Sequence, residues 1–278
     1  MSRLTYRISA AAAVLVLTAC GPLAREADSG GVEPTGERPS PVTRSVAERA
    51  CGIEAPADVE IDDMTVGTED GVQLRAAVLG TGARGVVMLH QTNDGLCGWL
   101  PYASHLANQN FQVVVFDRRC TFGSTCVEEP AAYDFIADVQ AVLGTLSGRG
   151  ADRAALVGAS FGGAVAIGAC ASLEVEACVA VSPAQFENYL GRGITANNAI
   201  GRVRTPTLIA VAPDDPSSPV DTVAALTRRA LPDVVTSEVL PAGGAHGWDA
   251  LVDPLDPDLP MPFSARLVAF LDQHLSKP

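Results

Sequence analysis

One short segment of the chain carries the residue type best suited to nucleophilic chemistry. Ser160 lies between Gly158 and Gly162, after an apolar run over 155–157 and before residues with helical character. A serine on so sharp a strand-to-helix turn has strained backbone angles, so the neighbours two positions away must lack bulk. The following helix would direct free N–H groups at an anion that forms near the serine oxygen. The segment therefore predicts a serine nucleophile.

A base must accept the proton of this serine, because its hydroxyl is a poor nucleophile at neutral pH. Of the 4 histidines, His90 ends an apolar run, and His105 and His274 lie within segments of helical spacing. His246 lies in a loop after a predicted strand, where small neighbours leave its ring room to turn. We therefore expect His246 to be the base, with a solvent-bonded loop histidine as the alternative.

The imidazole in turn requires a carboxylate that holds its tautomer and stabilises the imidazolium. Two candidates, Asp214 and Asp215, follow an apolar run at 207–212. Ligands bind at the carboxyl ends of the strands in open α/β sheets, and both aspartates would lie at that edge. The aspartate that does not contact the imidazole would cap the turn or the next helix.

The elements that must position these residues alternate between strand and helix. A hairpin is expected at 64–79, where two alternating segments flank a tight acidic-Gly turn. Further strands are expected from apolar runs at 85–90, 113–117, 155–159, 178–181, 207–212 and 238–240, and helices from apolar spacing at 99–108, 133–146, 220–230 and 262–275. This order predicts an α/β fold, with a mostly parallel, twisted sheet of about eight strands and helices on both faces.

The ordered motifs resemble those of the α/β-hydrolase family, which includes serine esterases, lipases and dienelactone-hydrolase-like enzymes. The resemblance spans residues 64–275, and the segment around Ser160 has the form of the family's nucleophile elbow. Residues 206–216 resemble a strand followed by Gly-x-x-Asp-Pro, with Ala212 in the glycine position. Residues 117–120 resemble the family's Asp-x-Arg-Gly segment, with a cysteine replacing the glycine.

The resemblance implies hydrolysis of a carboxylic ester through a covalent acyl-serine. Ser160, Asp215 and His246 would form the triad, in the chain order that the family shows. Ser160 would attack, His246 would accept and return the proton, and water would complete the second half-reaction. No metal or organic cofactor is required. The alternatives are a peptidase or amidase with the same triad, and a catalytically silent substrate-binding lipoprotein.

The resemblance also indicates which residues would surround the reacting carbonyl. Phe161 would donate one backbone N–H to the oxyanion, and the turn after the strand at 85–90 would supply the second. Thr92 is the first choice for this donor and Gln91 the second, because Gln91 occupies the place where the family usually has glycine. Besides Phe161 itself, the expected pocket walls are Asn93, Phe122, Phe186 and Trp248.

The predicted site has little to cover it. Many relatives insert a helical lid between the strands that end near Ser182 and begin near Pro206. Here the intervening segment, 183–205, is long enough for one short helix. We therefore expect an α/β-hydrolase fold with a minimal lid or none, and a small or polymer-borne acyl substrate.

The N-terminus indicates export and lipid anchoring. Arg3 and Arg7 precede an apolar stretch at 8–17, which is signal-peptide architecture. The sequence Leu-Thr-Ala-Cys that ends at Cys20 resembles the lipobox of bacterial lipoproteins. The expected organisation is a signal peptide at 1–19, a lipidated Cys20 with a flexible tether to residue 50, and a catalytic domain at 51–278. Cleavage near residue 19 without lipidation is the alternative.

The net charge of the chain excludes some classes of binding partner. The formal net charge is −13 and the sequence pI is about 4.6. This balance argues against nucleic acid and against electrostatic adhesion to anionic lipid. Cysteine and histidine do not cluster at the spacing of a zinc site. The expected partners are an ester substrate and, through the lipid anchor, the outer face of a bacterial membrane.

Six cysteines remain after Cys20, an even number in an exported chain. Six cysteines allow 15 pairings, so the sequence alone leaves the connectivity open. Proximity in the chain favours two short bridges, and the remaining two cysteines would tie the start of the domain to the predicted oxyanion loop. The expected bridges are Cys120–Cys126, Cys170–Cys178 and Cys51–Cys97. Reduced, buried thiols are the alternative.

Overall fold

The computed structural model describes residues 44–54, 58–129, 133–243, 246–253 and 256–276. The expected signal peptide, the lipidated Cys20 and the tether up to residue 43 lie outside the described residues. None of the helices in the described ranges has both the length and the apolar character that a bilayer crossing demands.

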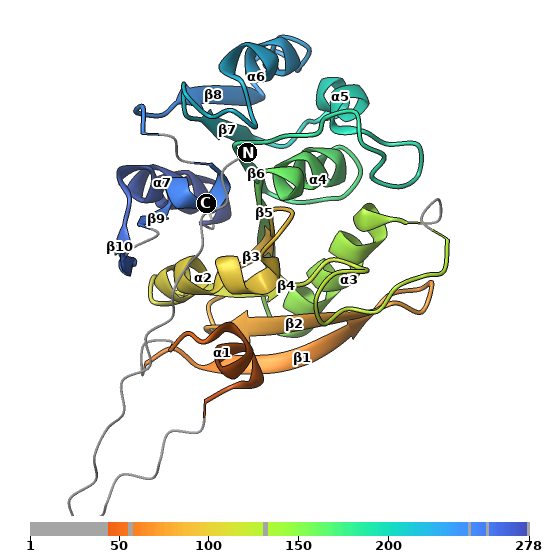
Figure 1. The fold of residues 1–278 in the computed structure, drawn as a ribbon, viewed down its shortest axis with the longest axis vertical. Helices are drawn as coiled ribbons and strands as arrows, with labels where there is room; N and C mark the ends of the chain where they lie inside the picture. Colours follow the sequence, from red (N-terminus) through yellow and green to blue (C-terminus); the bar gives the residue numbers. More distant parts are fainter. Residues whose placement is uncertain (1–43, 55–57, 130–132, 244–245, 254–255, 277–278) are drawn as a thin grey trace, which may run out of the picture. The chain divides into compact units, whose positions relative to one another are not determined.

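An eight-stranded sheet in the order β1-β2-β4-β3-β5-β6-β7-β8 forms the centre of the molecule (Figure 1). The strands are β1 (Ile61–Gly67), β2 (Gln73–Leu79), β3 (Arg84–Leu89), β4 (Phe111–Phe116), β5 (Arg153–Ala159), β6 (Ala177–Val181), β7 (Thr207–Val211) and β8 (Val235–Val239). β2 runs antiparallel to both β1 and β4, and the other neighbours are parallel. This confirms the mostly parallel sheet that the sequence predicts.

Helices cover both faces of the sheet, as expected. The helices α3 (Phe135–Gly148) and α4 (Phe161–Cys170) lie on one face, and α2 (Leu100–Ala107) and α7 (Pro262–Leu275) lie on the other (Figure 1). Successive residues of each strand enter opposite cores. In β3, for example, Val87 and Leu89 pack under α3 and α4, whereas Val86 and Met88 pack under α2 and α7. Burial on both faces explains the continuous apolar runs of the inner strands.

The start of the domain includes residues that we expected in the tether. A helix, α1 (Val46–Cys51), begins at a capping box in which Ser45 and Glu48 satisfy each other's backbone N–H groups. The N–H of Ala47 donates to Asp63 of β1 at 2.8 Å, and the Ala47 side chain is buried. The folded domain therefore includes residues N-terminal of Cys51.

The connection between β6 and β7 is short, as expected for a molecule with a minimal lid. It carries a four-residue helix, α5 (Ala196–Ala199), and a 3-10 turn, η3 (Ile200–Arg202). After β7 the chain continues through α6 (Val220–Thr227), η4 (Gly247–Ala250) and a two-stranded ribbon of β9 (Val252–Asp253) and β10 (Asp256–Pro260). The sequence gives no clear signal for this ribbon because its strands are short and rich in Asp and Pro.

Two disulfides join segments of the described domain. Cys51 at the end of α1 is bonded to Cys97 in η1 (Gly95–Gly98), so the first helix is tied to the loop after β3. Cys120 and Cys126 close a short loop after β4. Cys120 takes the place of the family's glycine and has the left-handed φ of 63° that glycine would favour.

The third expected bridge, Cys170–Cys178, is wrong, because both residues are free thiols. Cys170 ends α4 and Cys178 lies in β6, and both are buried in the core on the α3–α4 face. The thiol of Cys178 donates to the Ala166 carbonyl at 3.5 Å. Burial, followed by the neighbouring Cys178, raises the pKa of the Cys170 thiol, which disfavours the thiolate that disulfide formation requires.

Candidate active site

The strained turn between β5 and α4 holds Ser160 at the carboxyl edge of the sheet. Its φ of 52° and ψ of −118° lie outside the regions that L-residues favour. A Cβ on Gly158 would lie 2.1 Å from the Gly162 carbonyl oxygen, and a Cβ on Gly162 would lie 2.1 Å from that of Leu89. Both glycines are therefore required by the close approach of the elbow to itself and to the end of β3.

The elbow lies where the strand order reverses. β3 has β4 on one side and β5 on the other, and Leu89 pairs with Gly158 across the β3–β5 ladder. At such a point the loops after the two strands diverge and leave a crevice in which ligands bind. The loop that carries Gln91 and Thr92 therefore begins beside Ser160.

Asp215 and His246 form a hydrogen-bonded pair at the same edge. Asp215 follows β7, its side chain is buried, and its Oδ2 lies 2.8 Å from His246 Nδ1. Its other oxygen accepts the N–H groups of Ser217 and Ser218, which fix the orientation of the carboxylate. Asp214, by contrast, is exposed and accepts the N–H of Gly243. The structure thus places Asp215 against the imidazole and Asp214 in the loop that precedes it.

The loop after His246 returns across the sheet towards the elbow. Gly247 has a φ of 62°, and a Cβ at this position would lie 3.2 Å from the Cβ of Ala159, the residue before Ser160. The η4 turn contacts both β5 and β6. His246 is thereby held next to the elbow. No hydrogen bond joins it to Ser160 in the described part of the chain, and contacts of this kind often tighten only when substrate binds.

Phe161 and Thr92 line one hollow of about 470 Å³ beside the elbow. Phe161 is the first residue of α4, so its N–H has no partner within the helix. The Gln91 side chain does not line this hollow. Its Nε2 donates to Asp94 at 3.4 Å, and its buried Oε1 would lie 2.1 Å from a Cβ on Gly247. The Gln91 side chain therefore fills space under the histidine loop, whereas Thr92 lines the hollow.

The four other predicted wall residues do not line this hollow. Phe122 is 60% exposed and turns its edge to His90, and Asn93 is exposed. Phe186 lines a separate hollow between its own loop and α6. Trp248 is buried, with its ring 5.6 Å from that of Trp99. Aromatic type alone did not reveal which rings pack in the core.

The hollow has walls that the sequence analysis did not identify. Its lining comprises Thr92, Arg118, Phe135, Phe161, Gln185, Glu187, Asn188 and Tyr189. Four of these residues come from the loop after β6, which has no periodicity or motif that could have indicated a role. Arg118 occupies the variable position of the Asp-x-Arg segment, directly after an apolar strand. That location was the one available signal.

His90 acts as a structural residue beneath the oxyanion loop. Its Nε2 accepts the N–H of Arg118 at 3.0 Å, and its Nδ1 contacts the Gln91 carbonyl. Burial, with a smaller contribution from the charge of Arg118, lowers the pKa of His90 to about 3. The ring is neutral at physiological pH and joins the loop after β3 to the loop after β4.

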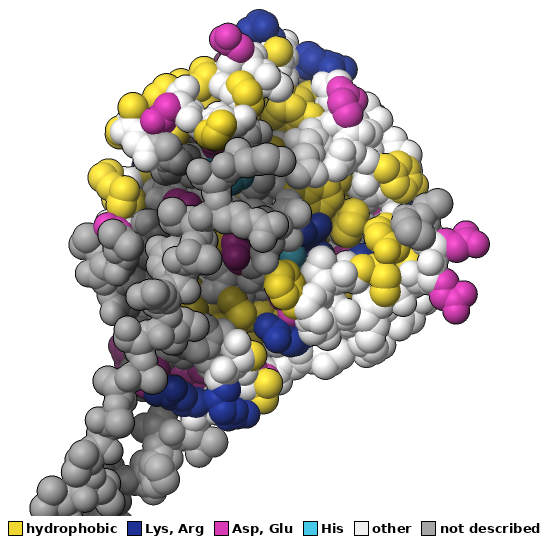
Figure 2. All heavy atoms as spheres, in the orientation of Figure 1, with side chains coloured by type: hydrophobic (Ala, Val, Ile, Leu, Met, Phe, Trp, Pro, Cys, Tyr) yellow, Lys and Arg dark blue, Asp and Glu magenta, His cyan; other side chains and the backbone are white. Residues whose placement is uncertain are grey.

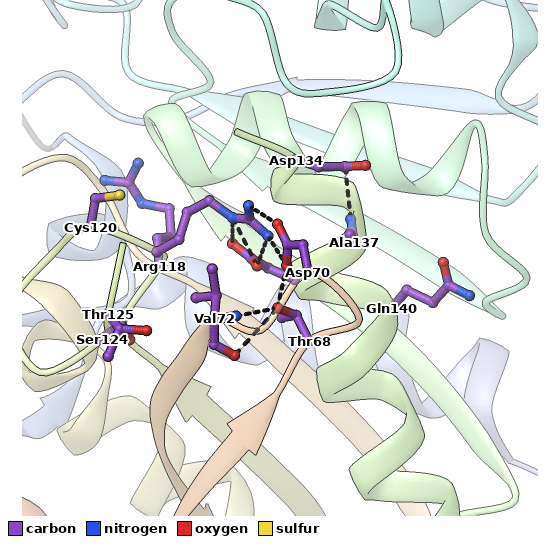
Figure 3. Close-up of polar contacts among 12 residues, drawn as sticks. Thr68, Asp70, Val72, Arg118, Cys120, Ser124, Thr125, Asp134, Ala137 and Gln140 are labelled. Carbon is purple, nitrogen blue, oxygen red and sulfur yellow. Dashed lines mark hydrogen bonds and ion pairs between the residues drawn. The ribbon is translucent and has the colours of Figure 1, made fainter. Parts of the chain in front are cut away.

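A cluster of charged residues supports the loop after β4 (Figure 3). The fully buried Arg119 donates to both carboxylate oxygens of Asp138 on α3 and to Asp70 in the hairpin turn. Asp117 accepts the N–H groups of Leu96 and Gly123 at 2.8 and 3.1 Å. These groups satisfy one another, so we assign them to the architecture of the site.

Comparison with known proteins supports the fold and the family. Residues 86–275 match the profile of the family described as "Alpha/beta hydrolase family". No curated protein sequence matches the chain significantly. Among solved structures, the chain is similar to the esterase Pf2001 of Pyrococcus furiosus, with 19% identity, a TM-score of 0.66, and coverage of 86% of this chain and 100% of that one.

Two other similar structures are both described as hydrolases. A predicted CIB-like hydrolase from Thermoplasma acidophilum has 18% identity and a TM-score of 0.60, over 77% of this chain and 99% of that one. XC6422 from Xanthomonas campestris, described as an a/b serine hydrolase without lid, has 20% identity and a TM-score of 0.52, over 67% and 85% of the two chains. At these identities the likeness shows a shared fold.

Proposed function

This chain belongs to the alpha/beta hydrolase family, and from that premise we propose that it is a serine hydrolase that cleaves carboxylic esters. The observation that carries the proposal is the hydrogen bond between His246 and the buried carboxylate of Asp215, at the sheet edge where Ser160 lies on its strained elbow. A serine, a histidine and a carboxylate from separate segments would together activate the serine as a nucleophile.

The proposed reaction proceeds in two halves. Ser160 Oγ attacks the ester carbonyl carbon while His246 Nε2 takes its proton, and Asp215 stabilises the resulting imidazolium. The N–H groups of Phe161 and Thr92 stabilise the oxyanion. When the tetrahedral intermediate collapses, the C–O bond breaks and His246 returns the proton to the departing alcohol. Water then attacks the acyl-serine, assisted by His246, and releases the acid.

The short connection between β6 and β7 favours substrates that need no deep tunnel. Its one four-residue helix leaves the elbow without a cover comparable to a lid domain. Small or polymer-borne acyl groups are therefore the proposed substrates. The lipid anchor expected at Cys20 would hold this site at the outer face of a bacterial membrane, and the mass of the mature N-terminal peptide would test that.

The test is hydrolysis of short-chain p-nitrophenyl esters by the wild-type chain and by Ser160→Ala, with labelling by a fluorophosphonate probe in parallel. We expect turnover and labelling in the wild type, and a loss of about 10⁵- to 10⁶-fold in kcat for the variant. An unchanged thermal unfolding midpoint would show that the variant is folded. Labelling without ester turnover would indicate a peptidase or amidase, and the absence of both would refute the proposal.

A further inference from the structure

Arg118 is a buried cation that forms no ion pair with any residue the structure describes. The residue is 7% exposed, and it follows β4 directly after Asp117. Its guanidinium carbon lies 4.6 Å from the centre of the Phe161 ring and 5.8 Å from that of Phe135. Its buried Nε has no hydrogen-bond partner. Within the described ranges, no carboxylate oxygen lies within ion-pairing distance of it.

The nearest carboxylates are already engaged by other groups. Asp117 accepts two backbone N–H groups and lies 2.9 Å from Arg75, and Asp138 is bonded to Arg119. In Figure 3, Arg118 lies beside this network and makes none of its dashed contacts. The acidic residue in the lining of the hollow is Glu187, which is exposed and accepts a hydrogen bond from Asn197.

The position of Arg118 relates it to the reacting groups. Its guanidinium lies over the ring of Phe161, whose N–H is the proposed oxyanion donor, and both residues line the hollow beside the elbow. Figure 2 shows basic and histidine side chains next to each other near the middle of the face, among hydrophobic side chains. The stacking on Phe161 holds the planar guanidinium in place. A guanidinium can donate two parallel hydrogen bonds to the two oxygens of one carboxylate.

Burial lowers the pKa of Arg118 to about 10, which leaves the guanidinium charged at neutral pH. A buried charge is costly to a fold unless an opposite charge pairs with it. Arg119, the next residue, shows how this fold pairs an arginine that has a purely structural role. In the described part of the chain Arg118 lacks that pairing, and it lines the hollow beside the elbow.

We propose that Arg118 binds a carboxylate of the substrate, so that the preferred esters carry a free carboxylate near the scissile bond. This inference rests on the proposed esterase function and adds the substrate class to it. The carboxylate could belong to the acyl part, as in a monoester of a dicarboxylic acid, or to the alcohol part. Both sources present the same chemistry to the guanidinium, and the experiment distinguishes them.

The experiment compares two matched pairs of esters. Monoethyl glutarate against ethyl valerate tests a carboxylate on the acyl part, and meta-acetoxybenzoate against meta-tolyl acetate tests one on the alcohol part. The enzymes are the wild type and two variants of Arg118. Arg118→Met keeps an apolar side chain on Phe161, and Arg118→Lys keeps the charge but cannot donate two parallel hydrogen bonds. Arg228→Met, at an exposed arginine after α6, is the control for net charge.

The measured quantity is the ratio of kcat/KM for the charged ester to that for its neutral partner. We expect a ratio of about ten- to a hundredfold in one pair for the wild type and Arg228→Met. The ratio should fall close to one in Arg118→Met and lie between the two in Arg118→Lys. A wild-type ratio of one or less in both pairs, or a ratio that Arg118→Met does not change, would overturn the inference.

A binding measurement separates this inference from the proposed function. If the wild type hydrolyses none of the esters, the proposed function fails, and calorimetry on Ser160→Ala with the same four esters still tests Arg118. Tighter binding of a charged ester that is lost in Ser160→Ala/Arg118→Met would support the carboxylate site. Equal binding of the charged and neutral partners would refute it.

Discussion

Arg118 and Arg119 are neighbours in the chain and both are buried, yet their surroundings are opposite. Arg119 is enclosed by Asp138 and Asp70, with four N–H···O contacts of 3.0 Å or less. Arg118 has aromatic faces on one side and an open hollow on the other. The difference teaches that burial of a charge does not define its role. What matters is whether its partners belong to the fold.

The same contrast separates two regions of the molecule. Around Asp117, His90 and Arg119, which we call the support cluster, each of these side chains has hydrogen-bond partners within the protein. Near the hollow, some polar groups have hydrogen-bonding capacity that no described residue uses. These groups are the hydroxyl of Ser160, the first N–H of α4 and the guanidinium of Arg118. The support cluster fixes the loops after β3 and β4, and Phe161 and Arg118 line the hollow beside the elbow.

The largest expected effect comes from the adjacent residues Asp214 and Asp215. Asp215 belongs to the candidate site, and Asp214 lies at the surface. Asp215→Asn should lower kcat by about 10⁴-fold, because an amide favours the wrong tautomer of His246 and cannot stabilise the imidazolium. Asp214→Asn is the matched control, and should cost about tenfold or less because the Asp214 carboxylate accepts the N–H of Gly243, whereas Asp215 is the aspartate bonded to the imidazole. Steady-state ester hydrolysis measures both. Equal losses in the two variants would contradict the assignment of Asp215.

A smaller effect, on stability, should come from the support cluster. Arg119→Met leaves Asp138 buried without its partner, and should lower the free energy of unfolding by about 3–5 kcal/mol. Adding Asp138→Leu removes the unpaired carboxylate and should recover part of this loss. Urea unfolding monitored by circular dichroism measures the change. If Arg119→Met were no less stable than Arg118→Met, the distinction between the two arginines would be lost.

The smallest expected effect is the pH dependence due to His90. Because the folded state lowers its pKa to about 3, the unfolded state alone takes up a proton as the pH falls below about 6.5. The contribution of His90 to stability is thus present above that pH, and declines by about 1.4 kcal/mol per pH unit between there and about pH 3.

His90→Gln removes this titration while leaving an acceptor for the Arg118 N–H. The variant should be less stable than the wild type at pH 7, by about 1–3 kcal/mol, and the difference should shrink at pH 5. Urea unfolding at the two pH values measures it. A stability difference that is independent of pH would show that His90 titrates normally and does not belong to the satisfied support cluster.

Much of the fold could be predicted because its signals are local. The inner strands are buried on both faces and read as continuous apolar runs, and α7 has the predicted bounds, Pro262–Leu275. The elbow is local as well, since Gly158, Ser160 and Gly162 specify one tight turn. The ribbon β9–β10 lacked such a signal, and so did the packing of α1 on β1.

The sequence by itself determined the order of the elements, the elbow and the type of chemistry that Ser160 and His246 suggest. Tertiary structure decided which aspartate meets the imidazole, that Cys170 and Cys178 are free thiols, and which aromatic rings enclose the hollow. It also decided that Arg119 has carboxylate partners, whereas Arg118 has none among the described residues. The physical reason is that a side chain's partners depend on its direction and on segments distant in the chain. Neither is encoded in the spacing of nearby residues.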